Sequence, residues 1–376
     1  MNFSFFRRVV VPALVLTSSL AVVGGVSAQP KSGADVVAAD LESPWGVAFL
    51  PEGRFLVTER PGRLRVVAAN GTVGAPVAGL PRIEASGQGG LLDVQVDSGF
   101  AANRTSYFCY SEPDASGSAN STALASAQLS ADDSRIEGVK VLFSQRPKVS
   151  SRSHFGCRIV EARDGTLFMT LGDRFSRRDD AQKLDNHNGK VIRIRKDGSV
   201  PPDNPFVGRQ GALPEIWSYG HRNGQGATLA PDGRFWMHEH GAQGGDEINV
   251  PQAGKNYGWP VITYGENYGG GKIGEGTAKA GMEQPLHYWV PSIAPSGMAF
   301  LTSDRYGAAW KGNLFVGSLK FGYVDRIVLK NGRVVSEHKL LEDGNARIRD
   351  VKQGPDGFLY VLTDESKGKL LRIKPR

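Results

Sequence analysis

The sequence predicts an all-β protein built as a β-propeller, and two observations support this prediction. Glycine and proline are abundant, at 48 and 21 residues, and short apolar runs bounded by turn-forming residues replace helical periodicity. A Pro-Glu/Asp-Gly or Asp-Gly turn followed by an apolar strand recurs at residues 48–57, 162–169, 229–237 and 353–361. Because such a recurrence is typical of propeller blades, we expect about six blades of four antiparallel strands each.

Three further dipeptides indicate tight hairpins: Asn70-Gly71, Asp197-Gly198 and Asn331-Gly332. Their residues readily adopt the positive φ values that two-residue hairpin turns need. A β-sandwich would also account for the strands, but it would not explain the return of one turn-and-strand signature. A single six-bladed propeller over residues 29–376 is therefore the preferred interpretation.

The first residues have the pattern of an export signal. A short basic stretch is followed by an apolar run over residues 9–26, which contains Pro12 and ends in small residues. A membrane anchor would need about 20 strongly apolar residues without such interruptions. We therefore expect a signal peptide over residues 1–28, a periplasmic or secreted protein, and no stable membrane insertion after the signal is removed.

Charge and cysteine content narrow the possible functions. Without Arg7 and Arg8 the net charge falls from +7 to +5, and the basic residues are scattered along the chain. Such scattering argues against a nucleic-acid partner. The mildly basic charge is equally compatible with a basic funnel that attracts an anionic small molecule. Cys109 and Cys157, the two cysteines, could form a disulfide or remain buried thiols.

Several loops place glycine beside polar side chains, which lets a ligand approach the backbone closely. His154 follows a polar stretch and could act as a general base, with Asp173 orienting its imidazole. Arg222, a further loop residue, could neutralise an anionic ligand. Together with polar segments that contain no glycine, the candidate site loops cover residues 86–93, 153–158, 171–174, 219–226, 239–247, 255–259, 291–297, 318–320 and 347–350.

Other polar residues suggest an anion site and a metal site. Arg347 and Arg349 stand two positions apart, so on a strand they share one face and could form forked bonds to a carboxylate. Lys320 could add to this basic set. Asp246 and Glu247 follow two glycines and offer the hard oxygen ligands that suit calcium. Zinc spacing, a phosphate-binding loop and a dinucleotide fingerprint are absent from the sequence.

Taken in order, these loops resemble the soluble pyrroloquinoline-quinone (PQQ)-dependent aldose sugar dehydrogenases. The resemblance covers nearly the whole chain after the signal, and three motifs are specific: Gly87-Gln-Gly-Gly-Leu-Leu-Asp, Tyr219-Gly-His-Arg-Asn and Lys255-Asn-Tyr-Gly-Trp-Pro. It implies a six-bladed propeller with PQQ on its axis and calcium beside it. It also implies oxidation of an aldose at the anomeric carbon to a lactone, with electrons passed to an external acceptor.

The resemblance also implies a role for each matching residue. His154 is the general base, Asp173 its orienting partner, and Arg222 a stabiliser of charge on the quinone. Calcium at the cofactor would take the carbonyls of Gly241 and Ala242, and a further calcium site is implied at Glu247 and Tyr257. The implied cofactor contacts are Gln88, Arg222, Asn223, Gln225, Ser292, Lys320, Arg347 and Arg349.

The chain departs from the family pattern at a few positions. Gly224 and Ala242 stand where proline is common, which makes those loops less rigid. Cys109 and Cys157 replace small residues, a pair of changes that favours a disulfide. Two other functions remain open: a metal-dependent lactonase on a similar propeller, and a non-catalytic propeller that binds sugar or protein.

Overall fold

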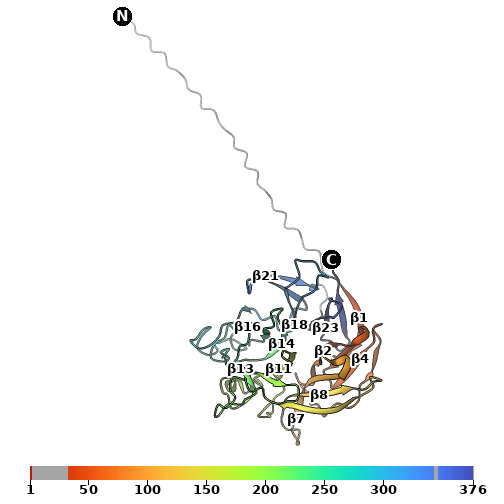
Figure 1. Cartoon of the computed structure of the whole chain (residues 1–376). Helices are drawn as coiled ribbons and strands as arrows, with labels where there is room; N and C mark the ends of the chain where they lie inside the picture. Colours follow the sequence, from red (N-terminus) through yellow and green to blue (C-terminus); the bar gives the residue numbers. More distant parts are fainter. Residues whose placement is uncertain (2–32, 343–345, 376) are drawn as a thin grey trace. The chain divides into compact units, whose positions relative to one another are not determined.

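The fold is a ring of β-sheets. The computed structural model describes residue 1 and residues 33–342 and 346–375. Their strands form six four-stranded antiparallel sheets around a central axis, so the predicted six-bladed propeller is confirmed (Figure 1). The signal peptide expected over residues 1–28 lies, apart from residue 1, outside the described residues.

Each of the first five blades is a run of four consecutive strands, and the first strand of each run contacts the first strands of its neighbours around the axis. Blade one contains β2 (Pro44–Phe49), β3 (Phe55–Glu59), β4 (Arg63–Val67) and β5 (Val73–Pro76). Blade two contains β6 (Leu91–Val96), β7 (Thr105–Pro113), β8 (Asn120–Leu129) and β9 (Ile136–Ser144). Blade three contains β10 (Gly156–Glu161), β11 (Thr166–Leu171), β12 (Lys190–Arg195) and β13 (Ile216–Tyr219).

The two following blades repeat this order. Blade four contains β14 (Gly224–Leu229), β15 (Phe235–Glu239), β16 (Asp246–Asn249) and β17 (His287–Trp289). Blade five contains β18 (Pro295–Phe300), β19 (Leu314–Ser318), β20 (Val324–Lys330) and β21 (Arg333–Leu340). The predicted turn at Asn331-Gly332 joins β20 to β21, and both of its residues have positive φ values.

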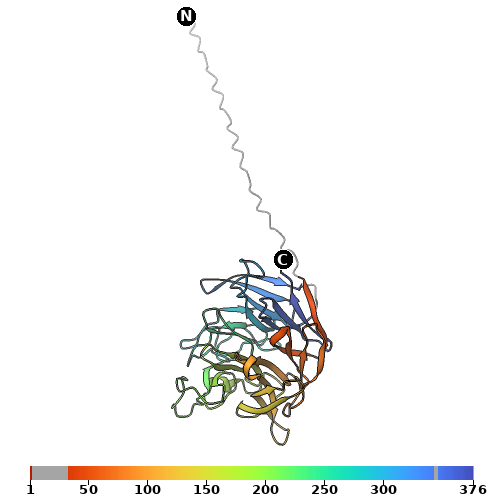
Figure 2. The same cartoon turned by 45° about the vertical axis from the view of Figure 1, so that its right-hand side comes forward.

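The last blade joins the two ends of the described chain. It takes β22 (Ile348–Gln353), β23 (Leu359–Thr363) and β24 (Gly368–Ile373) from the C-terminal end. Its outer strand is β1 (Ala34–Leu41), which pairs antiparallel with β24. In both views the red N-terminal strand lies beside the blue last blade (Figures 1 and 2). Backbone hydrogen bonds therefore close the ring.

Helices contribute little to this fold. The helical segments of the described chain are α1 (Phe100–Asn103) and two 3-10 turns at Pro51–Gly53 and Arg178–Gln182. None of the described helices is long or apolar enough to cross a bilayer.

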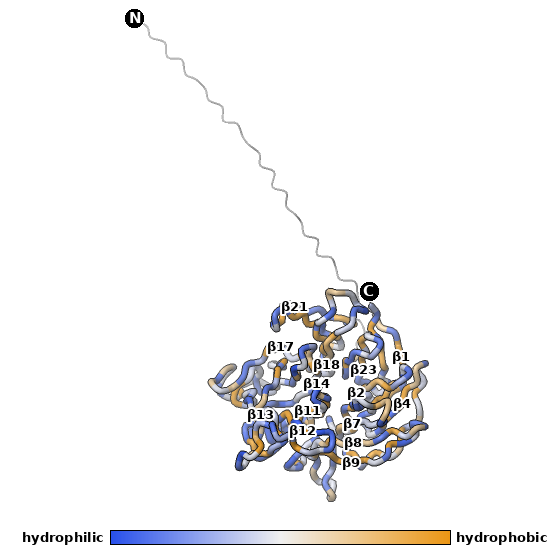
Figure 3. The backbone as a smooth tube through the Cα atoms, viewed as in Figure 1, coloured by the Kyte–Doolittle hydropathy of each residue, from blue (hydrophilic) through white to orange (hydrophobic). Residues whose placement is uncertain are grey.

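The hydrophobic core is divided among the interfaces between blades. Six clusters of buried side chains each lie between two neighbouring blades, as between blades one and two, where Leu56 and Leu64 meet Leu91 and Phe108. Apolar stretches accordingly recur all around the ring (Figure 3). Middle strands such as β3, β11 and β19 are buried along their whole length, because neighbouring blades cover them.

A buried arginine ties the inner strands together at the axis. The Arg158 guanidinium lies 2.9 Å from Asp350 and 3.2 Å from Asp93, and it donates to the carbonyls of Gln225 and Arg349. Its carbon centre lies 4.1 Å from the centroid of the Trp45 ring. These partners come from blades one, two, four and six, so a single side chain from blade three fixes the spacing of five inner strands.

A disulfide joins two neighbouring blades. Cys109 of β7 and Cys157 of β10 are bonded, with their Cα atoms 5.8 Å apart, inside the apolar cluster between blades two and three. Of the two alternatives that the sequence left open, the structure therefore contains the disulfide. The bond closes a segment of 48 residues, which includes most of blade two.

We expect this disulfide to stabilise the fold by about 4 kcal/mol, the chain-entropy value for a closed loop of this length. The Cys109→Ala/Cys157→Ala variant should unfold at a lower urea concentration than the unaltered protein. Dithiothreitol should shift the unaltered protein toward the variant and leave the variant unchanged. Equal midpoints for the oxidised protein and the variant would contradict the prediction.

Candidate functional site

Two cavities lie near the starts of the inner strands. The first, here called the axial cavity, has a volume of about 270 Å³. Residues from all six blades line it, including Trp45, Gln88, Asn223, Leu319 and Arg349, which places it on the propeller axis. The second, here called the lateral cavity, has a volume of about 280 Å³ and is lined by His154, Asp173, Arg222, Trp259 and others from blades three and four.

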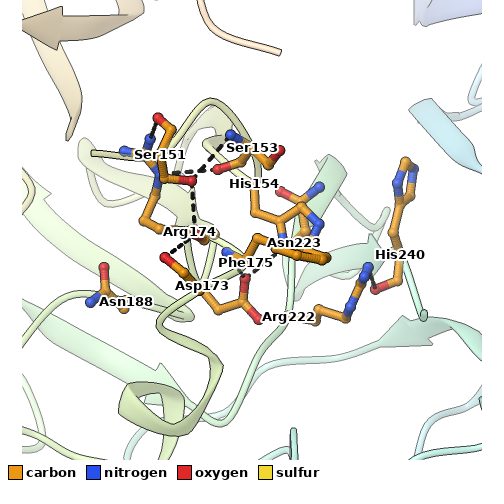
Figure 4. Close-up of polar contacts among 12 residues, drawn as sticks. Ser151, Ser153, His154, Asp173, Arg174, Phe175, Asn188, Arg222, Asn223 and His240 are labelled. Atoms are coloured by element: carbon orange, nitrogen blue, oxygen red, sulfur yellow. Dashed lines mark hydrogen bonds and ion pairs between the residues drawn. The ribbon is translucent and has the colours of Figure 1, made fainter. Parts of the chain in front are cut away.

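His154 and Asp173 meet because their strands are antiparallel. Gly156 at the start of β10 pairs with Leu171 at the end of β11, so the residues just beyond these positions come together. Nδ1 of His154 lies 2.6 Å from Oδ1 of Asp173 (Figure 4). Gly172 permits this approach, because a Cβ atom there would lie 2.0 Å from the carbonyl oxygen of His154. The predicted pairing of the two side chains is therefore present.

The protonation states of this pair follow from burial and from their mutual contact. Burial lowers the pKa of His154, and the hydrogen bond with Asp173 only partly opposes this effect. Burial by itself raises the pKa of Asp173, but the bond to His154 and the nearby charges outweigh it, so that pKa is lowered. The pair consequently consists of a neutral imidazole and a carboxylate, in which Nδ1–H donates to Asp173 and Nε2 carries a free lone pair.

Arg222 lies on the lateral cavity beside this pair. Its backbone N–H donates to Glu239, and its guanidinium donates to the carbonyls of His240 and Gly241. The guanidinium carbon lies 5.2 Å from the centroid of the Trp259 ring (Figure 4 shows Arg222 reaching toward His240). The Nε atom of Arg222 is buried and has no hydrogen-bond partner among the described residues.

The axial cavity is basic. Among the described residues, Arg60, Arg347 and Arg349 line it, against one carboxylate from Asp364. Arg349 lies 2.6 Å from Asp364, and Arg347 lies 3.4 Å from it, so the two arginines share one face as predicted. The Nε atom of Arg349 is another buried donor without a partner in the described chain. His240 also lines this cavity, and burial lowers its pKa to about 4, so it adds no charge at neutral pH.

Three predicted amide side chains surround the start of β10. Gln88 accepts a hydrogen bond of 2.8 Å from the backbone N–H of His154. Asn223 accepts one of 3.1 Å from Gly156, and Gln225 donates to the Gly156 carbonyl at 3.3 Å. All three line the axial cavity, so the structure brings them together as the sequence analysis expected.

Ser292 and Lys320, two further expected cofactor contacts, are not among the residues that line the axial cavity. Ser292 donates to Asp246 over 2.7 Å, and Lys320 is exposed, with its ammonium 5.0 Å from the Phe321 ring centroid. The cavity wall next to them is formed by their close sequence neighbours Ala294 and Leu319.

The residues expected at calcium fall into two groups. The carbonyl oxygen of Gly241 already accepts a hydrogen bond from Arg222, and Ala242 lies in the wall of the lateral cavity. Glu247 pairs across the sheet with Glu239, and burial together with that neighbour raises the pKa of Glu247 to about 8. Among the described residues, no three His, Cys, Asp or Glu side chains are grouped as a metal site.

Tyr257 lies close to the second group but cannot offer its hydroxyl. The Tyr257 hydroxyl donates to the Val250 carbonyl and accepts from the Gln252 N–H, and the Tyr257 ring stacks on His221. Only the backbone carbonyl of Tyr257 remains as a ligand.

Sequence reasoning missed several residues that line the cavities. Arg60 and Trp45 belong to blade one, outside the polar loops that the sequence analysis selects. His240 and Trp259 lie inside quoted motifs, but only the structure shows that His240 reaches the axial cavity and Trp259 the lateral one. Phe175 has a positive φ value and packs its ring edge-on against His154, a contact without a sequence signal.

Comparison with known proteins agrees with this arrangement. Residues 41–372 match the family model described as glucose/sorbosone dehydrogenase. The chain is 45% identical to the aldose sugar dehydrogenase YliI of Escherichia coli (strain K12), over 99% of each chain.

Solved structures extend the comparison. The soluble aldose sugar dehydrogenase of Escherichia coli in its apo-form superposes with a TM-score of 0.89 at 45% identity, over 92% of this chain and 100% of that one. The PQQ-bound aldose sugar dehydrogenase of Streptomyces coelicolor superposes with a TM-score of 0.74 at 26% identity, over 92% and 99%. With a family match across nearly the whole propeller, this chain belongs to the glucose/sorbosone dehydrogenase family.

Proposed function

We propose that this protein oxidises aldose sugars at the anomeric carbon to lactones, with PQQ as its cofactor. The observation that carries the proposal is the position of the His154–Asp173 pair, on the lateral cavity and hydrogen-bonded through His154 N–H to Gln88 of the basic axial cavity. The names of similar proteins, a sugar dehydrogenase and a PQQ-bound enzyme, support the same conclusion.

The axial cavity has the chemistry that PQQ needs. PQQ is a flat quinone with three carboxylates, and the cavity offers Arg60, Arg347 and Arg349 against one acidic side chain. The unpartnered Nε atom of Arg349 is a donor that an anionic ligand would satisfy. When bound, PQQ supplies an electrophilic quinone carbon that accepts a hydride from the sugar.

The chain itself supplies the base and the positive charge. The neutral His154 accepts the proton of the anomeric hydroxyl on Nε2, while Asp173 holds Nδ1–H and stabilises the imidazolium that forms. Arg222, on the same cavity wall, stabilises negative charge that develops near it. Phe175 and Trp259 supply aromatic walls of this pocket.

The two other functions receive less support. A metal-dependent lactonase needs free acidic or imidazole ligands, whereas Asp364 of the axial cavity is paired with Arg349 and Asp173 with His154. A non-catalytic propeller would have no use for a buried His–Asp pair beside unpartnered arginine donors. The dehydrogenase therefore explains more of the site.

For calcium, the two candidate positions differ in their fit. Glu239, Glu247 and the Asn249 Oδ1 atom, which is buried without a partner in the described chain, form a set of hard oxygen atoms that suits Ca²⁺. We propose that they bind calcium together with the Tyr257 carbonyl. The Gly241 carbonyl does not fit as it stands, because the Arg222 guanidinium occupies it.

We also propose export of the chain, with residues 1–28 as the signal peptide. The Cys109–Cys157 disulfide favours an oxidising compartment such as the periplasm or the extracellular space. The reduced enzyme would pass its electrons to an external acceptor there.

The first test concerns the protonation of His154. We expect NMR titration of the apo-protein to show that the pKa of the His154 ring lies below that of a free imidazole, because burial disfavours the cation. Since the unfolded chain binds this proton more readily, the residue also weakens the fold as the pH falls below 6.5.

Asp173→Asn should lower the pKa of His154 further, because it removes the negative charge that stabilises the imidazolium. Asp179→Asn is the matched control, since Asp179 lines the same cavity with an exposed side chain. A His154 ring that titrates equally in both variants would refute the proposed pairing.

The second test separates chemistry from cofactor binding. Apo-protein supplied with PQQ and calcium should reduce a dye when aldoses are added. His154→Ala should lower turnover by about 10²–10⁴-fold and leave PQQ affinity nearly unchanged. Arg347→Gln should weaken PQQ binding, by roughly ten-fold, because it removes an exposed cation from the cavity.

Binding is measured by quenching of protein fluorescence and turnover by dye reduction. Near-normal turnover in His154→Ala, or no dye reduction with any sugar despite bound PQQ, would show that the proposed function is wrong.

The third test concerns calcium at Glu247. Calcium at 100 times its dissociation constant should stabilise the unaltered protein by about 2.7 kcal/mol, and a chelator should reverse the effect. Glu247→Gln should abolish most of this gain, whereas Glu275→Gln, at an exposed carboxylate, should retain it. Thermal melts with and without calcium measure the difference, and equal gains in both variants would exclude this site.

A further inference from the structure

The Asp173 carboxylate accepts three hydrogen bonds, and one of them comes from a distant part of the chain. Oδ1 accepts from Nδ1 of His154 at 2.6 Å and from the Phe175 N–H at 2.8 Å. Oδ2 accepts from the indole Nε1–H of Trp259 at 2.7 Å, across 86 residues of sequence. Asp173 is 1% exposed, so water does not replace any of these donors.

Trp259 is itself held firmly in place. Its backbone N–H donates to the Gly220 carbonyl at 2.9 Å, and its carbonyl accepts from the Gln182 side chain at 2.7 Å. The ring packs in an apolar cluster with Ala181, Ala242 and Ile273. The indole N–H therefore reaches Asp173 from a fixed direction.

We propose that Trp259 is a positioning residue of this site, acting on His154 through Asp173. The indole N–H holds the carboxylate in the plane that presents Oδ1 to Nδ1 of His154, and so fixes which nitrogen of the ring remains free. The contact itself is independent of the reaction, whereas its catalytic consequence rests on the proposed function.

Loss of the Trp259 indole N–H should shift the pKa of the His154–Asp173 pair in a defined direction. Without the indole N–H, Oδ2 becomes a buried acceptor without a partner, and the carboxylate binds protons more strongly. The apparent pKa of the His154–Asp173 pair then rises, whichever residue carries the proton. The other charged or titratable groups that act on the pair are Arg174, Lys190, Arg222 and His240, and a Trp259→Phe substitution leaves all four in place.

A purely structural or sugar-contacting role for Trp259 would leave a different signature. Trp259 also lines the lateral cavity, so a phenyl ring in its place could change the Michaelis constant for the sugar. A looser pocket would not move the pH dependence, because it does not alter the acidity of the pair. The pH profile is therefore the readout that distinguishes positioning from packing.

The kinetic test uses full-length Trp259→Phe loaded with PQQ. We expect kcat to fall about ten-fold or more, and the acidic limb of the kcat/KM profile to move to higher pH by about one pH unit. Trp217→Phe is the matched control, because it removes an indole N–H that bonds to the Pro251 carbonyl at 3.3 Å on the outer side of blades three and four. That control should leave both quantities unchanged.

A second measurement uses the unaltered apo-protein and needs neither cofactor nor a variant that folds. The NMR signal of the Trp259 indole N–H should move with pH at the same midpoint as the His154 ring. The Trp217 indole signal should stay constant over that range. This result would establish the coupling even if no sugar were oxidised.

The outcomes are distinct. If the Trp259 indole signal ignores the titration of His154, or if Trp259→Phe loses turnover without a move of the acidic limb, the positioning role is overturned. If the indole signal follows His154 but the unaltered enzyme oxidises no sugar, the positioning role stands and the proposed function is wrong.

Discussion

The ion pairing of Arg158 at the propeller axis is the interaction on which the site depends. A buried guanidinium is costly unless its donors and its charge are satisfied, and here two carboxylates and two carbonyls do so. The carbonyls belong to Gln225 and Arg349, whose side chains line the axial cavity. The contact that fixes the inner strands thus also fixes the floor on which the cofactor would lie.

The two cavities differ in the side chains that line them. The axial cavity collects arginines and amides, which suits a flat anionic ligand held by many polar contacts. The lateral cavity collects aromatic walls around His154 and Asp173, which suits a sugar with apolar faces. Two non-glycine residues of the lateral cavity, His154 and Phe175, adopt positive φ values.

Burial explains why the same few residues serve both structure and chemistry. In water, the pKa of a histidine beside an aspartate would differ little from that of free imidazole. Here desolvation keeps His154 neutral, while the hydrogen bonds that Asp173 accepts keep its carboxylate charged. At Glu247, burial together with the neighbouring Glu239 carboxylate raises the pKa to about 8. A site of that kind gains from a cation, whereas the pair at His154 needs none.

The sequence by itself determined the blade architecture, since turn chemistry and strand patterning are local and repeat along the chain. It also indicated His154 and Asp173, which lie in short loops that combine glycine with polar residues, and Arg347 and Arg349, which stand two positions apart. Only the tertiary structure decided the Cys109–Cys157 bond, the entry of Arg60 into the axial cavity and the bond from Trp259 to Asp173. Each of these depends on the distance between residues of different blades or loops, and such distances follow from ring closure and packing rather than from local sequence.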